Sequence, residues 1–170
     1  SYECHNMHFA VFAACMIGDK KTALAVSSDL TCAVQRTKRD FPDDSHVARV
    51  LVDAFVMVEY CVYVRFGMWS EIGGLPPPPS DDHAARIFYS YASAVAGSVL
   101  ARADETARHL GELRKAVGEC PKDLVMQNNP LHRLGDIALH VATAEAEYRG
   151  RDSWTQSLDE ALELEDGLAY

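Results

Sequence analysis

Four short turns, each joining two apolar segments of helical character, constrain the fold of this chain more than any other feature. The turns are centred on Gly18, Gly67, Ala101 and Gly150, and the residues around them are similar. Gly67 and Ala101 lie 34 residues apart, and the two other neighbouring pairs lie 49 residues apart. Because one helical hairpin cannot bury its apolar face alone, hairpins that recur in this way are expected to stack. The sequence therefore predicts an all-α chain of about four stacked helical hairpins.

The segments between these turns are predicted to be helices from their apolar spacing, their caps and their breakers. Pro42 lies in a polar loop, and the four prolines at 76–79 stop the helix before them. The residues Ser80-Asp81-Asp82 are typical of a helix start. No segment has the alternating pattern and Asn-Gly turn of a β-hairpin. The expected helices are 5–17, 20–36, 45–66, 68–75, 83–100, 103–117, 131–149 and 153–165.

The most apolar run, 50–64, is open to two interpretations. Its many valines favour a strand, whereas its length and the spacing of Phe55, Val58 and Val62 favour a helix. We predict a helix. Asp53 and Glu59 interrupt the run, and a bilayer-spanning helix needs about 18 or more apolar residues. We therefore expect no insertion into a membrane.

The charge of the chain argues against nucleic acid as a partner. The 170 residues have a formal net charge of −9, whereas binding to a phosphate backbone needs clustered Lys and Arg. The length fits one domain or one segment of a repeat array. Residues 145–170 carry two basic and eight acidic groups. An acidic last helix is typical of a solvated outer face, and the alternative is that it attracts a basic partner.

The cysteines and the start of the chain bear on its location. An odd number of cysteines without CxxC spacing predicts reduced thiols in a reducing compartment, so we expect a cytoplasmic protein. The chain begins at Ser1, without an initiator methionine and within an apolar pattern, which predicts a fragment of a longer array. The helix 5–17 is apolar nearly all round, so we expect it to pack on a preceding unit or to mediate self-association. The five cysteines are Cys4, Cys15, Cys32, Cys61 and Cys120.

Several segments resemble a known repeat family. Residues 144–152, Ala-Glu-Ala-Glu-Tyr-Arg-Gly-Arg-Asp, followed by Ala-Leu-Glu-Leu-Glu at 161–165, look like the second half of a tetratricopeptide repeat. Together, 2–9, 64–72 and 161–170 resemble a family of large bacterial-type tetratricopeptide proteins of undefined biochemistry. The resemblance covers essentially the whole chain in the same order. At two positions where the repeat consensus has a small residue, this chain has Tyr60 and Thr155 instead. Members of that family usually continue on both sides. The repeat units are expected at roughly 1–36, 45–79, 83–117 and 131–166.

The resemblance implies a non-enzymatic scaffold that binds a protein or peptide, because tetratricopeptide arrays line a concave groove with the first helix of each pair. Aromatic and Met side chains mixed with polar groups suit such a partner. The competing interpretation places most of these residues in the core between stacked helices. The candidate partner-binding residues are His5, His8, Phe12, Met57, Arg65, Tyr91, His140, Glu147 and Tyr148. The same register also includes Cys15, Cys61, Phe88, Val95 and Ala144.

The alternative hypothesis is a metal-binding or enzymatic helical-repeat protein. His5 and His8 are three residues apart on one helix, and further ligands would have to come from Cys4, Cys61 or His140. A histidine pair that fixes helix packing is the competing interpretation. The sequence has no GxGxxG, P-loop or GxSxG motif, and Cys61 with His140 would form a nucleophile and base only if the fold joined them. We therefore favour no enzyme and expect no cofactor. A third hypothesis is a packing segment of a large assembly, without a groove ligand.

Overall fold

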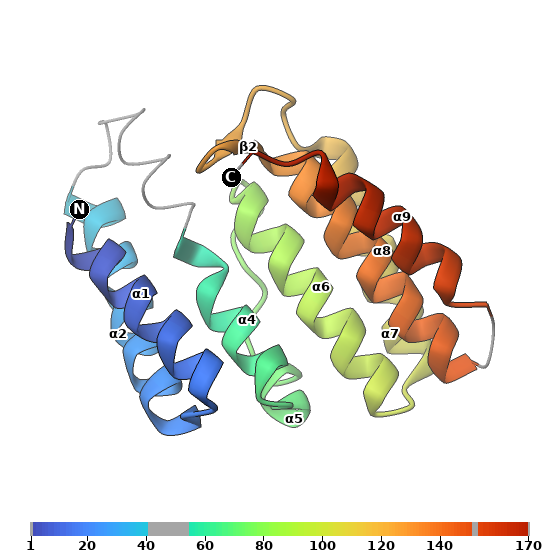
Figure 1. Ribbon diagram of the computed structural model, residues 1–170, viewed down its shortest axis with the longest axis horizontal. Coiled ribbons are helices and arrows are strands. Elements are labelled where there is room, and N and C mark those ends of the chain that lie inside the picture. The colour runs from blue at the N-terminus through green and yellow to red at the C-terminus, as the bar shows by residue number, and fades with distance from the viewer. Residues whose placement is uncertain (1, 41–54, 151–152, 170) are drawn as a thin grey trace.

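The computed structural model describes residues 2–40, 55–150 and 153–169, and these residues are almost entirely helical. The hairpins lie side by side in chain order (Figure 1). The prediction of an all-α helical fold is therefore confirmed. The four hairpins are α1 (Tyr2–Ile17) with α2 (Lys20–Asp40), α4 (Val58–Arg65) with α5 (Trp69–Ile72), α6 (His83–Val99) with α7 (Ala103–Glu119), and α8 (Leu131–Gly150) with α9 (Thr155–Asp166).

The helices pack in a pattern that repeats from hairpin to hairpin. The first helix of each hairpin contacts the first helix of the next, as α1–α4, α4–α6 and α6–α8. The second helix of each hairpin also contacts the first helix of the next, as α2–α4, α5–α6 and α7–α8. In this arrangement each hairpin buries its apolar faces against its neighbours, as stacked helical repeats do.

Three of the four turns have the same backbone structure. One residue just beyond the first helix has a positive φ in each, 76° at Gly18, 64° at Gly67 and 57° at Ala101. The next N–H then donates to a carbonyl five residues earlier, which satisfies an orphan carbonyl of the helix end. These bonds join Asp19 to Ala14 (2.8 Å), Met68 to Tyr63 (2.9 Å) and Arg102 to Gly97 (2.9 Å). At the fourth turn α8 extends through Gly150, and residues 151–152 lie outside the described residues.

Some helix ends differ from the expected ones. The second helix continues to Asp40, four residues beyond its expected end, and Thr37 Oγ1 donates to the Ala33 carbonyl inside it (2.9 Å). The fifth helix covers only Trp69–Ile72, because two glycines and then the four prolines follow. In the run 50–64, the described part is helical from Phe55 onward apart from one turn residue, and the expected start at 45–54 lies outside the described residues.

A short β-hairpin precedes α8, and no sequence signal indicated it. β1 (Val125–Met126) pairs antiparallel with β2 (Asn129–Pro130), in a register that places Met126 opposite Asn129. Gln127 opens the turn between them with a φ of 55°. The expected absence of β-hairpins is therefore corrected for this loop, where a glutamine takes a conformation that usually selects Gly, Asn or Asp.

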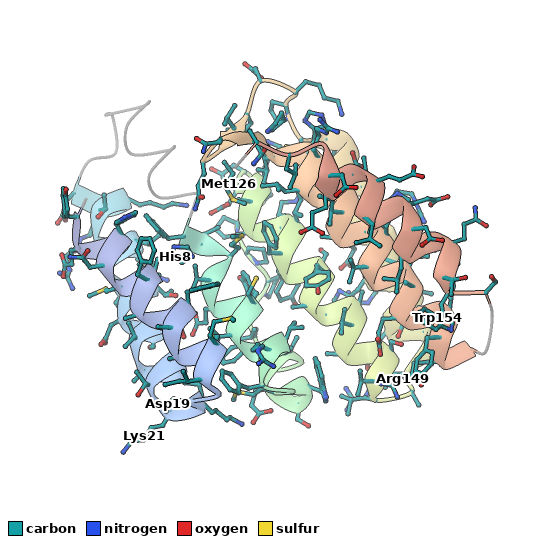
Figure 2. All side chains as sticks on the ribbon, viewed as in Figure 1. His8, Asp19, Lys21, Met126, Arg149 and Trp154 are labelled. Atoms are coloured by element: carbon teal, nitrogen blue, oxygen red, sulfur yellow. The ribbon has the colours of Figure 1, made fainter. Side chains whose placement is uncertain are left out.

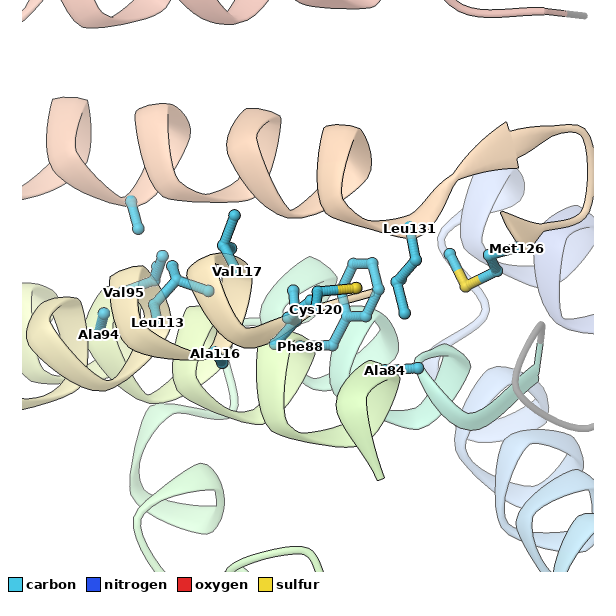
Figure 3. Packing of buried hydrophobic residues seen from close by; sticks show 12 residues of the cluster. Ala84, Phe88, Ala94, Val95, Leu113, Ala116, Val117, Cys120, Met126 and Leu131 are labelled. Atoms are coloured by element: carbon cyan, nitrogen blue, oxygen red, sulfur yellow. The ribbon is translucent and has the colours of Figure 1, made fainter. Parts of the chain in front are cut away.

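The apolar core consists of two main clusters. One lies between α1, α2 and α4 and includes Leu30 and Val62. The other lies between α6, α7 and α8, and Figure 3 shows Phe88, Val117 and Leu131 within it. The central helix α6 contacts α4, α5, α7 and α8, and most of its buried residues are Ala, Ser or Gly. Small side chains let four neighbouring helices approach one helix closely.

Candidate functional site

The first helices of the four hairpins bring a row of polar side chains together. The row consists of Cys15 from α1, Cys61 and Arg65 from α4, Tyr91 from α6 and Glu145 from α8. Hydrogen bonds or electrostatic effects on pKa link its members from one helix to the next. We refer to these five residues as the first-helix row.

Cys61 lies at the centre of the first-helix row. Its side chain is exposed to solvent, yet the surrounding protein, with a smaller effect from Cys15, raises the pKa of its thiol to about 11. Cys61 therefore combines an accessible side chain with protein packed around its thiol. At neutral pH the thiol keeps its proton, so it lacks the thiolate character of a nucleophilic cysteine.

Tyr91 connects the middle of the row to its α8 end. Burial raises the pKa of the half-buried Tyr91 to about 12, and the nearby Cys61 and Glu145 add to the rise. The phenol therefore keeps its proton at neutral pH and can donate a hydrogen bond. The Ser98 hydroxyl donates to the backbone carbonyl of Glu145 (3.2 Å) and joins α6 to α8 beside it.

Arg65 supplies the cation of the row. The exposed side chain ends α4, and its Nη2 donates to the backbone carbonyl of Cys15 at 3.3 Å. That carbonyl belongs to the last turn of α1, where unpaired carbonyls carry partial negative charge. A guanidinium has five N–H donors, so this bond leaves donors that can meet a partner.

An aromatic surface continues the row at the far end of α8. Arg149 Nε pairs with Glu145 Oε1 (3.0 Å), and its guanidinium carbon lies 5.6 Å from the centre of the Tyr148 ring. Tyr148 meets Trp154 edge to face at 5.6 Å. Figure 2 shows Arg149 and Trp154 close together at this end of the fourth hairpin. Tyr148 is 54% exposed, so its ring is accessible to a partner.

The two predicted histidines of α1 have different surroundings. His5 is exposed and lies edge to face with Phe9 (4.8 Å). His8 is partly buried against Phe55, 5.5 Å away, and this burial, with a smaller effect from His5, lowers the pKa of His8. His8 therefore contributes to the contact between α1 and the start of the second hairpin.

Of two further predicted residues, Phe12 lies on the surface and Met57 packs against the core. The Phe12 side chain is 58% exposed. Met57 is partly buried and packs against the cluster between α6, α7 and α8. Of these two residues, Phe12 is the one that a partner can reach.

His140 and Glu147 face α9, the partner helix of their own hairpin. His140 Nδ1 lies 3.0 Å from Glu160 Oε2, and the Ser157 hydroxyl donates to Glu147 Oε2 at 2.7 Å. The register that the repeat resemblance implies predicted that both residues line the groove. The structure instead engages them in contacts with α9.

Sequence reasoning omitted Glu145, which the structure brings to Tyr91. A signal for it exists in the spacing of the buried residues of α8, which recur every three or four positions on the side that faces the third hairpin. Glu145 is the next position in this series, and being polar it ends the buried stripe at the surface. The series is Leu131, Gly135, Ala138 and Ala142.

The described residues do not assemble a metal site. Across 2–40, 55–150 and 153–169, no three His, Cys, Asp or Glu side chains are grouped so that they could hold a metal ion. Cys4 is buried, whereas the neighbouring His5 is exposed. Cys61 is coupled to Tyr91, and His140 is paired with Glu160. The residues named for metal binding or covalent catalysis are thus engaged with different neighbours.

None of the helices in the described part of the chain is both long enough and apolar enough to cross a bilayer. Comparison of the chain with family models, with curated proteins and with solved structures finds no match. The tetratricopeptide resemblance therefore rests on the residues of the chain alone.

Proposed function

We propose that this chain is a tetratricopeptide-like scaffold that binds a protein or peptide segment along its first helices. The observation that carries the proposal is the first-helix row, in which four successive hairpins contribute to one chain of coupled polar side chains. Such a row suits an elongated partner, because each hairpin adds one more set of contacts along its length.

The chemistry of the row supports binding rather than catalysis. Cys61 and Tyr91 are both protonated at neutral pH, because their pKa values are raised to about 11 and about 12. Arg65 offers a cation at one end, and Tyr148 and Trp154 offer aromatic surface at the other. Aromatic and arginine side chains are the residues that most often dominate the binding energy of protein interfaces. The partner we propose is a peptide segment with an acidic group near Arg65 and apolar side chains toward Tyr148.

The exposed side chain of Cys61, at the centre of the first-helix row, allows a direct test of this proposal. We would select binders from a displayed library of random peptides on the immobilised protein and then measure their affinities for two variants. Cys61→Trp places a bulky ring at the centre of the first-helix row. Cys32→Trp is the matched control, because Cys32 is also an exposed cysteine but lies on α2, outside the row. Thermal melts establish that both variants remain folded.

We expect the selected peptides to bind wild type and Cys32→Trp equally and to bind Cys61→Trp at least about tenfold more weakly. Arg65→Gln should weaken acidic binders by about three- to tenfold, because it removes a charge-assisted hydrogen bond. Equal binding to Cys61→Trp, or failure of any peptide to be enriched, would contradict the proposal.

A further inference from the structure

The first helix carries a stripe of exposed apolar side chains that the first-helix row does not use. Tyr2 is 86% exposed, Phe9 59%, Phe12 58% and Met16 68%. With the exposed His5, these residues recur at alternating three- and four-residue steps. At 3.6 residues per turn, this spacing places all five on one side of the helix, as in the seam of a coiled coil. We call Tyr2, His5, Phe9, Phe12 and Met16 the α1 stripe.

The α1 stripe lies on the side of the helix opposite its buried face. The buried residues Cys4, Val11 and Ala14 face the core that α1 shares with α2 and α4. Helical geometry places the stripe about half a turn from them. The helix α1 is therefore apolar on two opposite sides, and among the described residues only the side with Cys4, Val11 and Ala14 is covered.

The area of the stripe is close to what a stable interface needs. The exposed parts of its aromatic and Met side chains, with the adjacent Ile17, offer roughly 600 Å² of apolar surface. Monomeric soluble proteins rarely expose larger continuous apolar patches, and a standard interface buries about 800 Å² per partner. The flanking His5, Asn6 and Ala13 are also exposed and extend the patch.

The charges around the stripe favour a second copy of the same helix as its partner. Among residues 2–17, Glu3 is the only acidic residue, and there is no Lys or Arg. Two stripes therefore meet without like-charge repulsion. In an antiparallel pair centred on Phe9, Tyr2 of one copy lies opposite Met16 of the other. This pairing also brings Glu3 toward the end of the other helix, where Lys20 and Lys21 begin α2.

The opposite end of the molecule is a poor partner for the stripe. A head-to-tail contact would place α9 against α1. Four acidic residues of α9 are exposed, and burying carboxylates against an apolar stripe without counter-charges is unfavourable. The exposed acidic residues are Asp159, Glu163, Glu165 and Asp166.

We propose that the α1 stripe is a self-association surface through which two copies of this chain form a symmetric dimer, with α1 packed antiparallel against α1 and Phe9 at the centre. Self-pairing of one patch is the usual arrangement in two-fold dimers. The proposal is independent of peptide binding by the first-helix row, because it rests on the side of α1 that faces away from the core.

The test is the mass of the protein in solution over a wide range of concentration, measured by sedimentation velocity and light scattering. Phe9→Glu places a charge at the centre of the seam. The matched control is Leu162→Glu, because Leu162 is 56% exposed, close to the 59% of Phe9, but lies on α9. Both positions are exposed, so both variants are expected to keep the helical circular dichroism spectrum of the wild type.

We expect a dimer for wild type and Leu162→Glu, and a dissociation constant at least about a hundredfold higher for Phe9→Glu. A photo-crosslinking residue at position 12 should capture a second copy, whereas one at position 162 should not. A wild type that stays monomeric at the highest concentration would overturn the proposal. An open-ended increase in mass that Leu162→Glu abolishes would show head-to-tail assembly and would also overturn it.

Discussion

At Gly135, α8 packs closely against the third hairpin. A Cβ at this position would lie 2.7 Å from Val117 Cγ2 and 3.3 Å from Ile87 Cδ1. Both neighbours are buried, and the valine is β-branched, so neither side chain moves away easily. We expect Gly135→Ala to lower the free energy of unfolding by about 1–3 kcal/mol.

The control for this substitution is Gly111→Ala in α7. Gly111 is exposed, and nothing lies within 4 Å of a Cβ added there. Because alanine has the higher helix propensity, Gly111→Ala should stabilise the protein by about 0.5–1 kcal/mol. Urea unfolding of both variants gives the comparison. A stabilising effect of Gly135→Ala would mean that α8 does not pack this closely.

His109 should make stability depend on pH. The side chain is buried, and its burial, with a smaller effect from Arg108, lowers the pKa of its imidazole. Arg108 Nη2 lies 2.8 Å from Nε2, and because a guanidinium only donates, Nε2 must be the acceptor. Glu112 Oε2 lies 2.9 Å from Nδ1, and this carboxylate opposes the lowering of the pKa only in part. The folded state therefore favours neutral His109.

The direction of the effect follows from proton linkage. Because the folded pKa lies below the unfolded value of 6.5, the unfolded chain binds the proton more tightly. Stability is therefore full above about pH 6.5 and falls as the pH decreases toward the folded pKa. We expect the free energy of unfolding to decrease between about pH 7.5 and 5.5, and less steeply in His109→Gln. An unchanged slope in that variant would contradict this assignment.

Single residues were the hardest feature to predict from the sequence. The groove register that the repeat resemblance implies includes Tyr91 and Arg65, and in the structure both belong to the first-helix row. Glu145 was missed, and His140 and Glu147 were assigned to the groove although they contact α9. A helix with two covered sides has two apolar stripes, and the sequence alone does not show which stripe faces which neighbour.

At the scale of the elements, the turn at Ala101 differs from the two that precede it. Ala101 has a φ of 57°, in a position where the other two turns have glycine. A left-handed conformation is unfavourable for an L-residue by roughly 1–2 kcal/mol. Replacing Ala101 by glycine removes this cost, but it also raises the entropy of the unfolded chain, which offsets part of the gain in stability. We expect Ala101→Gly to raise the free energy of unfolding by about 0.5–1 kcal/mol.

The reciprocal change is Gly18→Ala. A Cβ at Gly18 would meet nothing within 4 Å, so this variant measures the backbone conformation without a steric clash. It should lower stability by a similar amount, about 1 kcal/mol. Thermal or urea unfolding measures both effects. If the two variants shift stability in the same direction, the shared turn conformation is not the cause.

Elements were predictable where local chemistry decides them. The turns, the Asp82 cap of α6 and the stop at the four prolines all depend on residues close in sequence. The end of α2 was not predictable, because residues 37–40 contain no breaker and the helix simply continues. The contact of Arg65 was not predictable either, because its Nη2 donates to the Cys15 carbonyl of α1, a helix of another hairpin. That contact depends on how two hairpins meet.

At the scale of the whole molecule, the order of the hairpins follows from the sequence, but the contacts that join the side chains of the first-helix row do not. Stacking in chain order is the simplest way to bury hairpins that recur along a chain. The angles between successive hairpins decide which side chains of neighbouring first helices meet. The sequence contains no local signal for those angles. The first-helix row could therefore be approximated from the repeat register and located only with the structure.

The stacked arrangement should make stability uneven along the chain. The central helix α6 is held by α4, α5, α7 and α8, whereas α1 contacts α2 and α4, and α9 packs chiefly on α8. In a repeat array each unit is stabilised mainly by its neighbours, so the ends open at a lower free energy than the middle. Hydrogen exchange followed by mass spectrometry should therefore find the slowest amides in α6 and faster exchange in α9. At concentrations that favour the α1-to-α1 dimer, exchange should slow in α1 and stay unchanged in α9. Equal protection in all helices would contradict this expectation, because it would mean that the four hairpins unfold as one cooperative unit.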